Sequence, residues 1–157
     1  TNVVAMLVDA LPDGERFRVV ADDAGEYVRA CRDRYDVVLM DAFDRRGIAS
    51  GLELPAFYDA LRGRLYPDGA VVANVAGFRA ERDGLIDLMR RVWGDNVLAV
   101  PVEEDDNDIV FAFCDPSFEP RWRWIERQAE AMRARYDIEF PAFARRLKQR
   151  RRALSLP

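Results

Sequence analysis

The stretch that decides the fold is Tyr35-Asp-Val-Val-Leu-Met-Asp-Ala-Phe-Asp44, an apolar run that ends abruptly in two acids. Residues 37–40 have the length and composition of a fully buried strand. Asp41 and Asp44 follow the carboxyl end of that strand. Ligands of open α/β sheets bind in the crevice outside the carboxyl ends of the strands. The sequence therefore places a candidate site at these two acids.

Composition excludes several classes of protein. The chain has 157 residues, half of them hydrophobic, which suits one domain with a full core. Its formal net charge of -4 argues against a dedicated nucleic-acid binder, which would be basic overall. There is no histidine, so Ser-His-Asp chemistry, Cys-His chemistry and His-ligated zinc are removed from consideration.

The cysteines and the hydropathy of the sequence indicate where in the cell the protein is expected. Cys31 and Cys114 lie far apart without metal-ligand spacing, which is typical of reduced core residues of an intracellular protein. No apolar run approaches the roughly 20 residues of a transmembrane helix, and no signal peptide is visible. We therefore expect a cytoplasmic protein that holds no metal and binds no membrane.

Apolar periodicity predicts alternating helices and strands, which implies an α/β fold with a mostly parallel sheet. Helices are expected at residues 2–11, 25–34, 54–65, 83–93 and 122–136, and strands at residues 17–21, 37–40, 70–75, 96–102 and 108–113. The last two strands are close in sequence and are expected to form an antiparallel hairpin. We expect residues 1–114 to form one α/β domain and residues 115–157 to be its C-terminal helical extension.

Three motifs in combination resemble one known family. Asp22-Asp-Ala24 follows one predicted strand, the Asp-x-x-Asp of residues 41–44 follows the next, and Phe57-Tyr58 lies in the helix after that. Together with residues 65–72, they resemble the spermidine synthase-like group of aminopropyltransferases, over roughly residues 3–113. The resemblance implies the class I methyltransferase-like (Rossmann-like) fold. The Gly-rich cofactor loop of that fold should precede Asn2, so the domain is expected to be incomplete at its N-terminus.

The resemblance also implies roles for individual residues. Asp41 matches the carboxylate that acts as general base for the attacking amine, and Asp44 matches the second acid, which helps bind the amine. Asp23 and Ala24 match the pair that contacts the adenine end of the nucleoside. The implied substrates are a small-molecule amine and a nucleoside sulfonium, either decarboxylated S-adenosylmethionine or S-adenosylmethionine. A carboxylate pair suits this chemistry because it attracts an ammonium and can accept its proton.

Two segments depart from the family pattern. Arg45 stands where a proline usually follows the second acid, and residues 101–104 replace the Tyr-Pro-x-Gly run that closes the amine pocket. These departures leave the identity of the amine open.

The residues by themselves leave other readings open. Asp23 could serve only as a helix N-cap, Asp41 only as a polar loop residue and Asp44 only as a helix cap. Phe57 and Tyr58 are typical core residues. The leading function is aminopropyl transfer from decarboxylated S-adenosylmethionine to an amine, as in polyamine biosynthesis. One alternative is an S-adenosylmethionine-dependent methyltransferase. The other is a non-catalytic homologue or fragment that acts by forming a homodimer through the predicted helix at residues 122–136.

Overall fold

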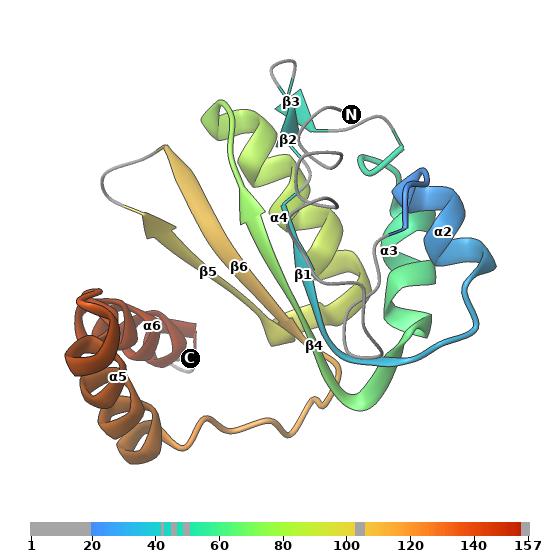
Figure 1. The fold of residues 1–157 in the computed structure, drawn as a ribbon. Coiled ribbons are helices and arrows are strands. Elements are labelled where there is room, and N and C mark those ends of the chain that lie inside the picture. Colours follow the sequence, from blue (N-terminus) through green and yellow to red (C-terminus); the bar gives the residue numbers. More distant parts are fainter. Residues whose placement is uncertain (1–19, 42, 45–46, 49–50, 103–105, 155–157) are drawn as a thin grey trace.

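The computed structural model describes residues 20–41, 43–44, 47–48, 51–102 and 106–154. These residues form a sheet with helices on both faces (Figure 1). The helices are α2 (Ala24–Ala30), α3 (Pro55–Gly63), α4 (Arg79–Trp93), α5 (Trp122–Tyr136) and α6 (Phe140–Leu154), with the 3-10 helix η1 (Gly94–Asn96). The strands are β1 (Tyr35–Met40), β2 (Phe43–Asp44), β3 (Gly47–Ile48), β4 (Leu65–Val75), β5 (Val97–Val102) and β6 (Asn107–Phe113).

The main sheet has four strands in the order β1-β4-β6-β5. Strands β1 and β4 are parallel, whereas β6 is antiparallel to both of its neighbours. Strands β1, β4 and β5 therefore run in one direction, and β6 runs against them. This arrangement confirms the predicted Rossmann-like α/β class with its antiparallel hairpin strand. Strands β2 and β3 form a separate two-stranded sheet that was not among the predicted strands.

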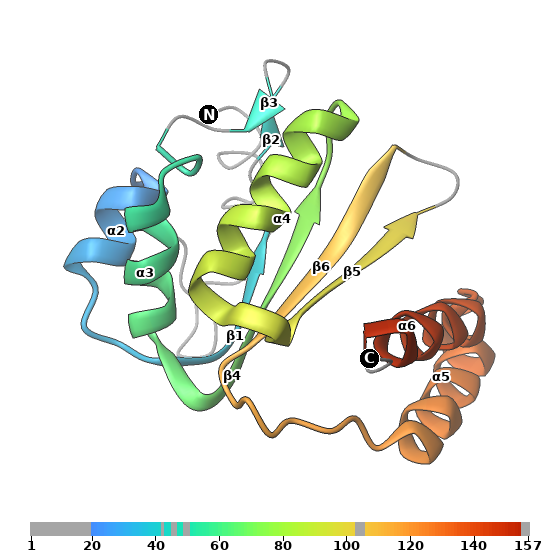
Figure 2. The ribbon, with the colours of Figure 1, turned by 180° about the vertical axis from the view of Figure 1, so that it is seen from behind.

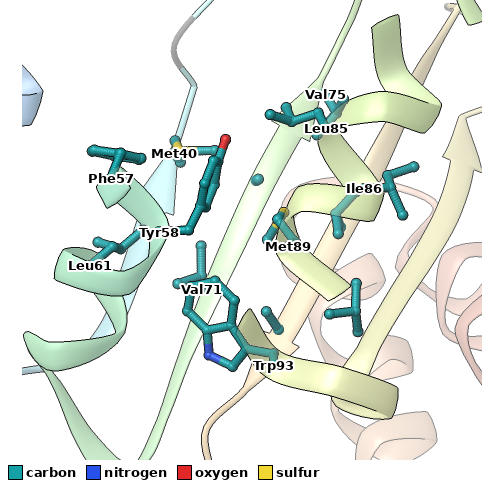
Figure 3. Packing of buried hydrophobic residues seen from close by; sticks show 14 of the residues in the cluster. Met40, Phe57, Tyr58, Leu61, Val71, Val75, Leu85, Ile86, Met89 and Trp93 are labelled. Atoms are coloured by element: carbon teal, nitrogen blue, oxygen red, sulfur yellow. The ribbon is translucent and has the colours of Figure 1, made fainter. Parts of the chain in front are cut away.

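The core lies between the sheet and helices α3 and α4 (Figure 2). Tyr58 of α3, Val71 of β4 and Met89 of α4 are fully buried there (Figure 3). The Tyr58 ring meets the rings of Phe57 and Trp93 edge to face, with centroids 5.2 Å and 6.4 Å away. Burying each large apolar side chain of this kind contributes about 1.5–3 kcal/mol. The expectation that Phe57 and Tyr58 are core residues is confirmed.

Helices α5 and α6 pack together and cover the β5 side of the opposite face (Figure 1). The Phe143 ring of α6 lies 6.3 Å from the Phe111 ring of β6, and Leu98 of β5 is buried. An ion pair of 2.5 Å between Lys148 and Glu126 joins the two helices. Helix α6 contains the basic segment of residues 145–152 and lies within the C-terminal extension that was expected to be helical.

Strand β1 differs from its prediction as a fully buried strand. Met40 is buried, but Val37 is 54% exposed and Leu39 is 78% exposed. The reason is that β1 is an edge strand of the sheet and is covered on the α3 and α4 face alone among the described residues. The predicted helix at residues 2–11 and most of the predicted strand at residues 17–21 lie outside the described residues.

Several element boundaries also differ from the predictions. Helix α2 ends at Ala30 instead of continuing to Arg34. Strand β4 is counted from Leu65, but its residues 66–69 form a bulge without partners on β1, because Tyr35 pairs with Leu65 and Val37 pairs with Ala70. A side chain at position 69 would crowd the backbone, because a Cβ atom at Gly69 would lie 3.0–3.1 Å from three carbonyl oxygens.

The two cysteines are free and partly buried. Cys31 Sγ lies 3.2 Å from the Tyr35 hydroxyl, which in turn lies 3.1 Å from the Tyr27 hydroxyl. The hydrogen bond that Tyr35 donates stabilises the Cys31 thiolate, so it lowers the pKa of the Cys31 thiol. Because this bond needs the proton of the Tyr35 hydroxyl, it raises the pKa of Tyr35. This cluster ties α2 to the start of β1. No described helix is long and apolar enough to cross a membrane.

Candidate functional site

Asp41 directly follows the last residue of β1 and is exposed. The Asn74 side chain of β4 donates a hydrogen bond of 3.1 Å from Nδ2 to Asp41 Oδ1. The contact follows from the register, because Met40 lies opposite Ala73 and the next residues of the two parallel strands are therefore neighbours. Ligands of open α/β sheets bind at the carboxyl ends of the strands, so the Asp41 carboxylate lies where a ligand is expected.

The polar contact continues onto a third strand. Asn107, the first residue of β6, donates a hydrogen bond of 2.8 Å from Nδ2 to Asn74 Oδ1. Side chains alternate between the two faces of a strand, so Asn74 shares a face with Val72, whereas Val71 points to the core. We call Asp41, Asn74 and Asn107 the polar row. Asp41 and Asn74 lie one step beyond the apolar pair Leu39 and Val72 toward the carboxyl end of the sheet. Asn107 is a diagonal neighbour of Asn74, which pairs directly with Ile109.

An ion pair on the other face fixes the start of β6. Arg82 of α4 lies 3.2 Å from Asp108, measured from Nε to Oδ2, and their side chains are only 15% and 14% exposed. Partly buried pairs are screened by salt less than surface pairs are. The pair joins β6 to α4 at the residue directly after Asn107, the last member of the polar row.

Asp23 is the N-cap of α2. Its Oδ1 accepts a hydrogen bond of 2.9 Å from the Glu26 backbone N–H, and Ala24 begins the helix. Both residues are exposed. The N-terminus of α2 points toward the end of the sheet at which β1 terminates (Figure 1, Figure 2). The second carboxylate oxygen of Asp23 accepts no hydrogen bond from a described residue, so this side chain is available to a ligand.

Asp44 lies in β2, where it pairs with Gly47. Its side chain is outside the described residues. The structure therefore brings Asp41 together with Asn74 and Asn107, and the role predicted for Asp44 stays a prediction.

Other polar groups do not add to the site at Asp41. A hollow of about 390 Å³ between α4, β5 and α6 is lined by Arg79, Arg82, Arg90 and Arg150, with Asp83 and Asp108, and does not include Asp41. Its positive lining does not suit a cationic amine. Within the described part of the chain, no group of three acids and cysteines could hold a metal ion.

The sequence reading missed Asn74 and Asn107. A signal for Asn74 was present, because asparagine is depleted in strands and here interrupts the apolar run Val71-Val-Ala-Asn-Val75. No comparable signal marks Asn107, which follows an acidic segment that reads as a solvated turn.

Comparison with known proteins identifies the family. Residues 4–93, more than half of the chain, match the spermine/spermidine synthase domain. This chain belongs to the spermine/spermidine synthase family. The family segment contains Asp23, Asp41 and Asn74, and ends at Trp93, the last residue of α4.

Relatives of this spermine/spermidine synthase family member share its sequence at a moderate level. It is 29% identical over 147 residues to the polyamine aminopropyltransferase of Chromobacterium violaceum, covering 93% of this chain and 56% of the relative. It is 28% identical over 128 residues to the polyamine aminopropyltransferase of Neisseria meningitidis serogroup A, covering 82% of this chain and 49% of the relative. The chain thus spans about half the length of these curated relatives.

Solved structures agree with the fold of this family. Human methyltransferase-like protein 13, in complex with SAH, superimposes with a TM-score of 0.64 at 18% identity, covering 99% of this chain and 67% of that one. Spermidine synthase from Thermotoga maritima gives a TM-score of 0.56 at 17% identity, covering 75% of this chain and 40% of that one.

Proposed function

We propose that this chain carries the amine-activating part of an aminopropyltransferase, in which Asp41 is the general base. The reaction would transfer an aminopropyl group from decarboxylated S-adenosylmethionine to a small-molecule amine. The observation that supports it is the exposed Asp41 carboxylate at the carboxyl end of β1, held by Asn74 within the segment that matches the family. Asp44 is proposed to assist in binding the amine.

The chemistry explains why a carboxylate is needed. A primary amine with a pKa near that of lysine, about 10.4, is neutral in only about one molecule in two thousand at pH 7. Reaching the neutral form costs roughly 4–5 kcal/mol. Asp41 would attract the ammonium and accept one proton as the amine nitrogen attacks the carbon bound to sulfur. The new C–N bond forms, the C–S bond breaks, and its electron pair stays on the sulfur.

The nucleoside end is proposed to meet Asp23 and Ala24. Asp23 already uses Oδ1 to cap α2, and its Oδ2 is free to accept a hydrogen bond from an amino group of adenine. Ala24, which follows, presents only a methyl group, so the backbone there is open to a flat ring. This arrangement fits a neutral base that carries an amino group.

A second candidate is methyl transfer from S-adenosylmethionine. This candidate is supported by the similar fold of human methyltransferase-like protein 13, whose structure is a complex with SAH and matches 99% of this chain. The proton chemistry at Asp41 would be the same, because an amine again attacks a carbon bound to a sulfonium sulfur. For an amine acceptor, the two candidates differ in the sulfonium compound and in the group that it transfers.

The test uses the full-length protein. Calorimetry with decarboxylated S-adenosylmethionine and with S-adenosylmethionine decides which of the two is the substrate, and binding of neither would favour a non-catalytic homologue. Asp41→Asn should lower turnover at least about 100-fold while leaving affinity for the sulfonium compound nearly unchanged.

Asp36→Asn is the matched control, because Asp36 is exposed on the same strand at its opposite end. It should retain the turnover of the wild type. Equal turnover in Asp41→Asn and Asp36→Asn would overturn the role proposed for Asp41.

A further inference from the structure

We propose that Asn74 is a positioning residue for Asp41 and that Asn107 acts through Asn74. The inference rests on the proposed function, since it assigns the partners of the base. Asn74 binds one oxygen of the carboxylate, Oδ1, and leaves Oδ2 to face the amine. Asn107 holds the Asn74 amide in the orientation that this contact requires.

The direction of both hydrogen bonds follows from chemistry. An ionised carboxylate only accepts hydrogen bonds, so Asn74 must turn its amide N–H toward Asp41. Its amide oxygen then faces Asn107, which must donate in turn. A flip of either amide would set two acceptors or two donors against each other. The charge of Asp41 therefore fixes the orientation of both asparagines, and they in turn fix the carboxylate.

The backbone under the polar row is well placed for this task. Asn74 lies on β4, which is hydrogen-bonded to β1 on one side and to β6 on the other. The ion pair between Arg82 and Asp108 holds β6 at the residue after Asn107. Asp41, by contrast, follows the end of an edge strand. Strand β4, which is paired on both sides, therefore offers a better-supported anchor for the Asp41 side chain than the end of β1 does.

A stability role does not account for Asn74. Asparagine is unfavourable in strands, and the hydrogen bond to Asp41 is exposed, so it contributes little to the free energy of folding. A misplacement of about 1 Å in a catalytic group, however, can lower the rate about 100-fold. The positioning role explains why an amide stands where an apolar residue would suit the strand better.

The first test is kinetic and uses the full-length protein. Asn74→Ala should lower kcat about 10- to 100-fold with little change in KM for the sulfonium substrate, and Asn74→Gln should recover part of the loss because it retains the donor. Asn107→Ala should have a smaller effect. The double variant should match Asn74→Ala within about twofold, because Asn107 acts only through Asn74. Independent, multiplying losses would overturn the inference for Asn107.

The matched control is Asn96→Ala. Asn96 ends η1, next to Val97, which pairs with Ala112 at the opposite end of the sheet. This variant should keep the activity of the wild type. If Asn74→Ala is as active as Asn96→Ala in an active protein, the positioning role is overturned while the proposed function stands. A wild type without transfer activity would instead overturn the proposed function.

A second readout does not depend on activity. In Asp41→Ala, the side-chain amide NMR resonances of Asn74 should shift and exchange faster with water, and those of Asn107 should shift as well. The Asn96 resonances should stay in place. Unmoved Asn74 resonances in Asp41→Ala would overturn the contact on which the inference depends, whatever the enzyme assay gives.

Discussion

At the scale of single residues, Tyr58 combines complete burial with a hydroxyl group that has no hydrogen-bond partner among the described residues. An unpaired buried hydroxyl costs about 1–3 kcal/mol, whereas the ring contributes through its packing. Tyr58→Phe should therefore keep or raise the free energy of unfolding, by up to about 1 kcal/mol, and Tyr58→Ala should lower it by about 3–5 kcal/mol. Urea unfolding followed by tryptophan fluorescence measures both values.

The same residue predicts a pH dependence. Burial raises the pKa of Tyr58, so the folded protein keeps the phenol proton at a pH where the unfolded chain loses it. Below about pH 10 both states hold the proton, and the residue adds no pH dependence. Above about pH 10 the unfolded chain ionises and stability falls. The advantage of Tyr58→Phe over the wild type should therefore grow above pH 10; a loss of more than about 1 kcal/mol at pH 7 would indicate a bonded hydroxyl.

At the scale of elements, helix α2 allows the capping role of Asp23 to be separated from its proposed role in binding the nucleoside. Asp23→Ala removes the cap and should lower the free energy of unfolding by about 1 kcal/mol, whereas Asp23→Ser retains a capping oxygen and should change it little. Serine has no carboxylate with a second oxygen for adenine, so both variants should weaken binding of the sulfonium substrate. Unfolding and calorimetry on the two variants make the test. Full binding by Asp23→Ser would restrict Asp23 to its capping role.

Elements were predictable where their signals are local. Residues 122–136 were predicted as a helix and form α5, and Pro55 opens α3 as its fixed φ suggests. The exposure of Val37 and Leu39 in β1 was not predictable, because the same apolar sequence pattern can occur in a central strand or in an edge strand. The polar row was not predictable either: each of its two hydrogen bonds joins residues 33 positions apart, and only strand order brings them together.

At the scale of the whole molecule, the two faces of the sheet are covered unequally. Helices α3 and α4 cover one face, and α5 and α6 cover the β5 side of the other. Among the described residues, the β1 side of that second face is open, and the outer edge of β1 has no strand beside it. The polar row borders this open area, so whatever covers the face also borders Asp41.

The open face predicts self-association of the 157-residue chain. Exposed apolar residues on a free edge strand favour pairing with another chain, and Leu39 is 78% exposed on this face. Burying one leucine contributes about 1.5–3 kcal/mol, so Leu39→Lys should weaken self-association at least about tenfold, as measured by sedimentation velocity over a concentration series. Leu54→Lys is the matched control, since Leu54 is 53% exposed but occupies the N-cap position of α3 and is not part of the sheet. A chain that stays monomeric at high concentration, or equal effects of the two variants, would show that the open face of β1 does not drive association.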